Sequence, residues 1–400
     1  MRGGLNGGIS RIDVLLFIGV TLIGFSLLLP QLQAYRENAR ARSCGNNLAR
    51  IGIALNSYHD SHLGFPPGYF PADYTTLSDG TSRWRSNEPS YSWAAFLLPF
   101  LDFGELYADL RVDDAGLSNI LSDRSRWSLV EQKLPVFSCP SDRSGETMAS
   151  SPLRPTFRVI DRRLDRGSDS PSGGSSSYVG SGGYFELNHP LYSVSNRTPQ
   201  AMLRTKTGEN NGLFYVASHV HRRQIVDGLS STIAIGERAW FQGGASWVGI
   251  GNVRGVASGD TGTCLGRVYW KINEIPTSTI QLASEQIPVF VTPENNLTVP
   301  PGQSSRNGFG SYHPNGANFL LADGSVRFVG NGIDFVNTIS MTGADPSEPI
   351  PDIENLGVFQ RLGIRNDSFQ AEPLDSTIGR RVDNRAGLAK VRLERKGTSK

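Results

Sequence analysis

The sequence lacks the features that would assign it to a disulfide-rich scaffold or to a common enzyme class. Its 400 residues include only 3 cysteines, Cys44, Cys139 and Cys264, too few for a scaffold held together by disulfides. None of them stands in a C-x-x-C pair, so the sequence predicts no metal site. It also has no phosphate-binding loop, nucleophile elbow or H-E-x-x-H helix, and we therefore expect no catalytic residue and no cofactor.

An excess of charge is missing as well. The 39 Lys and Arg residues nearly balance the 37 Asp and Glu residues, for a net charge of +2, which argues against nucleic acid as a partner. Only the tail from Gly379 onward is basic, with eight basic and two acidic residues and a net charge of +6. Such a run is typical of a disordered, solvated segment, and we assign residues 341–400 to a C-terminal extension.

One long apolar run lies near the N-terminus. Residues 14–29 carry no charge, and the uncharged stretch continues to Tyr35. At ~1.5 Å per helical residue, residues 14–35 would reach about the ~30 Å thickness of a bilayer interior. The sequence therefore predicts a single membrane-spanning helix.

The flanks of this run set its expected orientation. No A-x-A-like site follows it, so ordinary signal-peptide cleavage is disfavoured. Two arginines precede the run and four follow it by position 50. By the positive-inside rule alone, this asymmetry would place the C-terminal side of the run in the cytoplasm. Long C-terminal domains cross the membrane largely regardless of charge, and the leader ending at Gly8 is short. We therefore expect the N-terminus in the cytoplasm and the C-terminal domain outside it.

An apolar seam continues beyond the run. Its members recur at spacings of four, three, four and three residues, which is the pattern of one helical face. They are Cys44, Leu48, Ile51, Leu55 and Tyr58. Glycines and prolines between positions 64 and 68 would end the helix. We predict a helical segment over 9–64 that is transmembrane at first and amphipathic later.

The remainder predicts a β-rich domain over 65–340. Residues 212–220, 225–237, 246–253, 268–270 and 288–292 carry β-branched and aromatic residues between turn signals. The clearest element is ANFLLADGSVRFV, in which Asp323-Gly324 suits a tight hairpin turn between two apolar strands. The predicted fold class is α+β, with a long N-terminal helix and an antiparallel sheet.

The N-terminus resembles the type IV prepilin signal. In that family a peptidase cuts after a glycine and methylates the new N-terminus, and an acid five residues on pairs with the freed amine of a neighbouring subunit. The matching residues are Gly8, Ile9 and Asp13. Three departures are Ile9 in place of phenylalanine, Arg11 in place of an apolar residue, and Asp13 in place of glutamate.

The rest of the chain resembles a large bacterial family of unknown function that combines such a prepilin-type segment with an H-x9-D-G motif. The resemblance runs from Gly8 to about Ile333. The segments that carry it, in chain order, are CGNNLARIGIALNSYHDSHLGFPPG, SWAAFLLPFLDFGELY, LPVFSCPSD, SSYVGSGG, IVDGLSSTIAIGER and HPNGANFLLADGSVRFV. It implies a pilin-like fold and a role in the envelope.

The motif residues His313, Asp323 and Gly324 have a structural interpretation. His313 and Asp323 would lie at opposite ends of one strand, too far apart to pair. We expect His313 to bond a backbone group and Asp323 to cap the turn. Cys44 and Cys139 are the pair that we expect to form a disulfide if the domain lies outside the cytoplasm.

Three other polar residues leave alternatives open. His219 and His221 alternate on a predicted strand and would share one face, which suits a transition metal, although the neighbouring arginines favour a solvated basic edge. Glu237 follows an apolar run and is either a buried acid or a strand-end charge beside Arg238; we expect the second, a local ion pair.

These patterns favour a pseudopilin-like structural or interaction protein of the cytoplasmic membrane. Its expected partners are a prepilin peptidase, membrane lipid and other pilin-like subunits or envelope components. One alternative is a membrane-tethered protein that binds a solute or polysaccharide and does not assemble. A second is an extracytoplasmic hydrolase, which requires His219, His221 or His313 to converge with carboxylates in one cleft.

Overall fold

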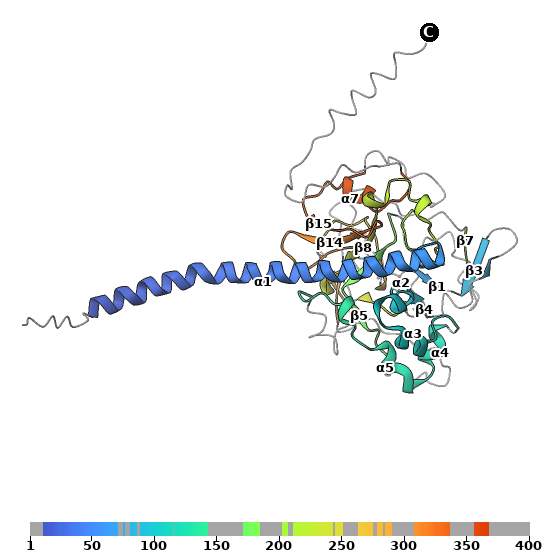
Figure 1. The fold of residues 1–400 in the computed structure, drawn as a ribbon, viewed down its shortest axis with the longest axis horizontal. Helices are drawn as coiled ribbons and strands as arrows, with labels where there is room; N and C mark the ends of the chain where they lie inside the picture. Colours follow the sequence, from blue (N-terminus) through green and yellow to red (C-terminus); the bar gives the residue numbers. More distant parts are fainter. Residues whose placement is uncertain are drawn as a thin grey trace, which may run out of the picture.

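A computed structural model gives the arrangement of the chain (Figure 1). It describes residues 11–70, 75–76, 81–85, 89–114, 116–142, 171–184, 202–206, 211–242, 245–250, 263–274, 278–282, 285–289, 308–336 and 356–367. The side chains at positions 13, 24, 25, 27, 28, 75–76, 81–85, 202–206, 241, 278–282 and 285–289 are outside the described set.

The longest element is the 52-residue helix α1 (Arg11–His62). It continues through Pro30, although a proline removes one hydrogen bond from a helix interior. The predicted seam is confirmed, because Cys44, Leu48, Ile51 and Leu55 are all buried. Figure 1 shows that this second half lies across the domain and that the first half projects away from it.

The projecting half of α1 does not confirm the predicted membrane crossing. Among the residues that the structure describes, no helix has both the length and the apolarity for a transmembrane span. The helix over 14–35 is present, but its membrane-spanning character is not established.

A five-stranded sheet forms the centre of the domain. Its order is β11-β6-β8-β14-β15, and its strands are β11 (Leu265–Gly266), β6 (Tyr178–Ser181), β8 (Ile233–Glu237), β14 (Gly316–Leu321) and β15 (Val326–Gly330). Neighbours pair antiparallel except β11 and β6, which are parallel. The predicted α+β class with antiparallel pairing is therefore confirmed.

Strand β14 separates two parts of the core. Because side chains alternate across a strand, Leu320 belongs to the cluster under α1, whereas Phe319 and Leu321 belong to a second cluster behind the sheet. The second cluster also contains Phe359 of helix α7 (Val358–Leu362). The sheet is thus covered by α1 on one face and by α7 on the other.

Smaller elements complete the described structure. The other strands are β1 (Tyr69–Phe70), β2 (Thr75–Thr76), β3 (Thr81–Arg85), β4 (Ser90–Ser92), β5 (Ser175–Ser176), β7 (Met202–Lys206), β9 (Ala245–Ser246), β10 (Gly249–Ile250), β12 (Ser278–Leu282) and β13 (Glu285–Val289). They form the sheets β1-β4-β10, β2-β3-β7, β5-β9 and β12-β13. The short helices are α2 (Trp93–Phe96), α3 (Gly104–Leu110), α4 (Leu117–Leu121) and α5 (Trp127–Val130), with 3-10 turns that include η3 (Pro135–Phe137) and η6 (Arg222–Gln224).

The strand predictions succeed only in part. The hairpin at Asp323-Gly324 is confirmed as β14 and β15. Residues 212–220 contain a single isolated bridge at Val216 instead of a strand, and 225–237 is a strand only in its last five residues. Residues 356–367, placed in the extension by the sequence, pack into the second core through Phe359 and Leu362. Their buried apolar side chains make them part of the domain.

The contact between α1 and the hairpin depends on a glycine. A Cβ atom at Gly52 would lie 2.8 Å from Leu320 Cδ1 and 3.2 Å from the Gly324 carbonyl oxygen. We expect Gly52→Val to lower the free energy of unfolding by about 1–3 kcal/mol, because it overpacks this contact. The matched control is Gly19→Val in the projecting half, where nothing lies within 4 Å. Urea unfolding followed by circular dichroism checks both; equal effects would contradict the prediction.

Candidate functional site

The motif histidine His313 lies in the turn that precedes β14. Its backbone N–H donates to Ser311 Oγ at 3.0 Å, and Ser311 Oγ donates to the Gly316 carbonyl at 2.6 Å. This local bonding holds the imidazole toward the middle of the sheet, where its side chain is 1% exposed. A buried, ionisable ring requires partners, since an unpaired charge in the interior is costly.

Two carboxylates supply those partners from distant parts of the chain. Glu37 of α1 places Oε1 2.7 Å from His313 Nδ1, and Glu237 at the end of β8 places Oε1 3.3 Å from Nε2. The expectation that His313 bonds a backbone group through its side chain is wrong: its ring lies between two acids. His313 therefore links helix α1 to the central sheet.

Each carboxylate has further donors. Glu37 accepts from Ser141 Oγ at 2.7 Å. Glu237 accepts from Asn318 N at 2.6 Å and from Asn318 Nδ2 at 3.1 Å, which ties β8 to β14 beside the histidine. These bonds fix the carboxylate oxygens and leave one oxygen of each acid facing the imidazole.

The expected ion pair between Glu237 and Arg238 is wrong. Consecutive residues of a strand point to opposite faces, so the two side chains diverge. Arg238 donates instead to the carbonyls of Gly308 at 3.0 Å and Leu265 at 2.8 Å. Burial lowers the pKa of Arg238 to about 9.

The electrostatics of the site favour the protonated imidazole. Burial by itself would lower the pKa of His313, but the hydrogen bonds and charges of Glu237 and Glu37 outweigh it, so the net shift is upward. Burial acts in the opposite sense on Glu37, and its bonds to Ser141 and His313 keep its pKa below the usual value.

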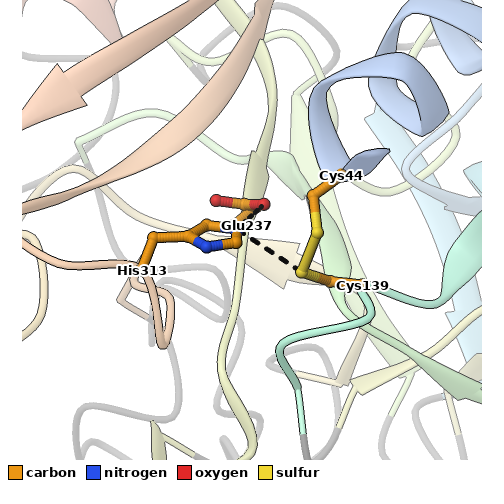
Figure 2. A group of neighbouring side chains, drawn as sticks. All are labelled: Cys44, Cys139, Glu237 and His313. Carbon is orange, nitrogen blue, oxygen red and sulfur yellow. Dashed lines mark hydrogen bonds and ion pairs between the residues drawn. A yellow bond between two sulfur atoms is a disulfide. The ribbon is translucent and has the colours of Figure 1, made fainter. Parts of the chain in front are cut away.

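A disulfide borders the histidine. Cys44 of α1 is bonded to Cys139, which follows η3, and this is the pair named from the sequence. Cys139 Sγ lies 3.5 Å from His313 Nε2. Figure 2 shows the His313 ring directed toward both the Glu237 carboxylate and the Cys139 sulfur. The covalent bond and the ion pairs therefore hold α1 at neighbouring points.

The four side chains in Figure 2 form a group with metal-ligand chemistry. Cys44, Cys139, Glu237 and His313 each offer one ligand atom, and these atoms lie within 4.8 Å of one another. Sequence reasoning predicted no metal site, because the four positions are widely separated in the chain and have no local spacing. The sequence does contain one signal for this group: Cys44, Cys139 and His313 each stand in a different segment of those that carry the family resemblance.

The other end of the motif also contacts α1. Asp323 Oδ1 accepts from Ser325 N at 2.8 Å and from Ser325 Oγ at 2.6 Å, so it caps the turn as expected. Gly324 has a φ of +90° and lies against Gly52 and Asn56 of α1. The H-x9-D-G segment therefore contacts the helix at both ends, through His313 at Glu37 and through Gly324 at Gly52.

The other two candidate histidines lie elsewhere. His219 and His221 are in the coil before η6, not on a strand, and their rings are 4.8 Å apart. His219 lies against Gly64, just beyond the end of α1. Glu37 and His62 are separated by about 38 Å of helix, at 1.5 Å per residue. The hydrolase alternative requires His219, His221 or His313 to converge with carboxylates in one cleft. His313 does meet Glu37 and Glu237, but its side chain is 1% exposed, and His219 and His221 lie near the far end of α1.

Histidines at this end of α1 predict a pH dependence. Burial and the nearby Arg222 lower the pKa of His59, against the opposing effect of Asp60, while burial and the neighbouring His221 and His62 lower the pKa of His219. Because the unfolded chain binds these protons first, stability is expected to fall as pH drops below about 6.5 toward the folded-state values.

The measurement is the urea midpoint between pH 5 and 8 in the wild type and in His59→Gln with His219→Gln. We expect the variant to lose less stability than the wild type across this window. The difference between the two chains isolates these histidines from every other titrating group. Parallel pH profiles would contradict the prediction.

The remaining sequence candidates cannot be placed. Gly8 and Ile9 lie outside the described residues, and so does the side chain of Asp13.

Comparison with known proteins identifies a family. No curated protein matches the chain. No solved structure matches it either. A family profile described as "Protein of unknown function (DUF1559)" matches residues 33–336, which include the second half of α1, both cysteines of the disulfide and the whole H-x9-D-G segment. Because this match covers more than half of the sequence, the chain belongs to that family of unknown function.

Proposed function

We propose that this chain is a pilin-like structural or interaction protein of the bacterial envelope, held at the membrane by the projecting half of α1. The observation that carries the proposal is the contrast between the two halves of one helix. Beyond Cys44 the seam is buried against the domain, whereas the described apolar side chains before Tyr35 are largely exposed. An exposed apolar surface of this length calls for an apolar partner.

The exposed apolar side chains on the projecting half of α1 would be stabilised by burial in an apolar environment. Phe17 is 73% exposed, and Leu15, Leu16, Val20, Leu22 and Ile23 are each more than 60% exposed. Full burial of one such side chain contributes about 1.5–3 kcal/mol. Several of them together supply enough free energy to hold the helix in lipid or against the same helix of neighbouring copies.

The disulfide supports an extracytoplasmic location. Disulfides persist in oxidising compartments and are rare in the cytosol. The bond between Cys44 and Cys139 begins nine residues after Tyr35 along α1, so oxidation would take place close to the point where the helix leaves the membrane. This agrees with a cytoplasmic N-terminus and an external domain.

Processing and assembly follow from the N-terminal resemblance. A prepilin peptidase would cut after Gly8 and methylate Ile9, and Asp13 would pair with the freed amine of a neighbouring subunit. The partners are the peptidase, membrane lipid and other pilin-like subunits. Mass spectrometry of the N-terminus in purified envelope tests this part; an intact Met1 would remove the processing step.

Membrane retention is tested with matched helix variants. Phe17→Gln combined with Leu16→Gln should release chain from the membrane fraction of a bacterial host. Ile53→Gln changes an equally exposed residue, 68% accessible, on the half that lies on the domain, and should leave retention unchanged. A wild-type chain that remains fully soluble without detergent would end the proposal.

A photocrosslinking experiment distinguishes assembly into oligomers from simple membrane tethering. With a photocrosslinking amino acid at Tyr35, the wild type should give crosslinked dimers and larger species. Asp13→Ala should lose them, while Glu105→Ala, which removes an exposed acid on α3, should keep them. Identical patterns for wild type and Asp13→Ala would favour the tethered binding protein.

A further inference from the structure

The cluster beside the disulfide has the composition of a tetrahedral metal centre. Two cysteines, a histidine and a carboxylate are ligands that Zn²⁺ takes at bond lengths of about 2.0–2.3 Å. Their ligand atoms lie within 4.8 Å of one another, and all four residues are buried. The sulfur atoms are joined to each other in this structure, so the cluster is in its oxidised form.

Two distances already match such a centre. Tetrahedral angles at Zn²⁺ place a sulfur and a nitrogen ligand about 3.5 Å apart and a nitrogen and an oxygen ligand about 3.3 Å apart. The structure has Cys139 Sγ 3.5 Å from His313 Nε2 and Nε2 3.3 Å from Glu237 Oε1. The two sulfurs, which are covalently bonded, would have to move apart on reduction.

The opposite nitrogen of the ring has the support that a metal-bound histidine needs. Ligand histidines usually donate their second N–H to a carboxylate, which fixes the tautomer and orients the ring. Glu37 Oε1 lies 2.7 Å from His313 Nδ1 and is itself held by Ser141 Oγ. With Nδ1–H donating to Glu37, Nε2 faces Cys139 and Glu237 and can bind a cation between them once it has lost its proton.

We propose that reduction of the Cys44–Cys139 disulfide converts this cluster into a site for Zn²⁺ or a similar divalent cation, with Cys44, Cys139, Glu237 and His313 as ligands. The reductant is a dithiol, which becomes a disulfide as the two cysteine thiols form. The cation then displaces one proton from each thiol and the Nε2 proton of the imidazolium, so that three protons are released to solvent. Glu37 is a positioning residue that acts through His313. The inference does not depend on the proposed function.

The experiment uses the full-length chain, with and without a phosphine reductant, titrated with Co²⁺ and then Zn²⁺. The reduced protein should bind one Co²⁺ with a sulfur-to-cobalt charge-transfer band, and Zn²⁺ should displace it. The oxidised protein should show no band. Cys264→Ser removes the buried thiol that lies outside the cluster and forms no disulfide, and it should leave the band unchanged.

Variants distinguish this site from any other. Cys44→Ser with Cys139→Ser should abolish the band. Glu37→Ala should weaken Co²⁺ binding by about 10- to 100-fold, whereas Glu37→Gln, which keeps an oxygen acceptor for Nδ1–H, should restore most of it. Circular dichroism establishes that each variant is folded.

Three results would overturn the proposal. The first is a reduced wild type that binds no Co²⁺. The second is a band that persists in the double serine variant. The third is a reduced chain that loses its fold and does not regain it when Zn²⁺ or Co²⁺ is added.

Discussion

Replacement of Glu237 by alanine is expected to lower the free energy of unfolding by about 3–5 kcal/mol, the usual cost of removing one member of a buried ion pair. The carboxylate lies 3.3 Å from His313 Nε2 and accepts two bonds from Asn318, one of them from the backbone N–H of β14. Its loss leaves a buried imidazole and a buried amide without this acceptor. Urea denaturation of the oxidised protein, followed by circular dichroism, measures the effect.

Two further variants provide comparison values for the effect of Glu237→Ala on the free energy of unfolding. Glu237→Gln keeps an oxygen acceptor of the same shape and should cost roughly 1–3 kcal/mol, because only the charge is lost. Glu105→Ala removes an exposed acid and should stay within about 0.5 kcal/mol of the wild type. If Glu237→Ala cost no more than Glu105→Ala, the linking role of the histidine would be refuted.

Loss of the disulfide is the second large effect. The bond joins residues 95 positions apart, and a loop of this length corresponds to about 4.7 kcal/mol of unfolded-state entropy in the chain-entropy model. Because measured values usually run lower, we expect Cys44→Ala with Cys139→Ala to lower the free energy of unfolding by about 2–5 kcal/mol. The measurement includes a chelator, since a bound cation would stabilise the reduced chain.

The reductant itself provides the control. A phosphine should destabilise the wild type by a similar amount and leave the double alanine variant unaffected, because the latter has no bond to reduce. Cys264 is buried and forms no disulfide, and both chains contain it, so its contribution cancels. A wild type with equal stability in oxidising and reducing buffer would contradict the prediction.

Local patterns were sufficient for the elements that hold the site. The seam from Cys44 to Tyr58 has a helical period, and that period correctly predicts that Cys44, Leu48, Ile51 and Leu55 are buried and that Tyr58 packs against the same core. Asp323-Gly324 predicts its hairpin because glycine takes the positive φ of the turn at no steric cost. These two predictions place α1 and β14, which are the two elements that the motif joins.

The cluster itself could not be read from local patterns. Glu37, Cys139, Glu237 and His313 come from helix α1, the segment after η3, the end of β8 and the turn before β14, which meet only in the folded domain. The strand predicted over residues 212–220 is also absent from the structure. Leu213 and Phe214 in this segment are buried by packing in coil and not by strand pairing. An apolar run indicates burial, but tertiary contacts decide the backbone conformation.

The two contacts that the H-x9-D-G segment makes with α1 fix the distance that the segment must span. Glu37 and Gly52 are 15 residues apart, which is about 22 Å of helix, and His313 to Gly324 must cover that same interval along the sheet. An insertion of one residue between His313 and Gly324 would also exchange the two faces of β14, sending Phe319 toward the helix. The length of the motif is thus set by the helix on which it lies.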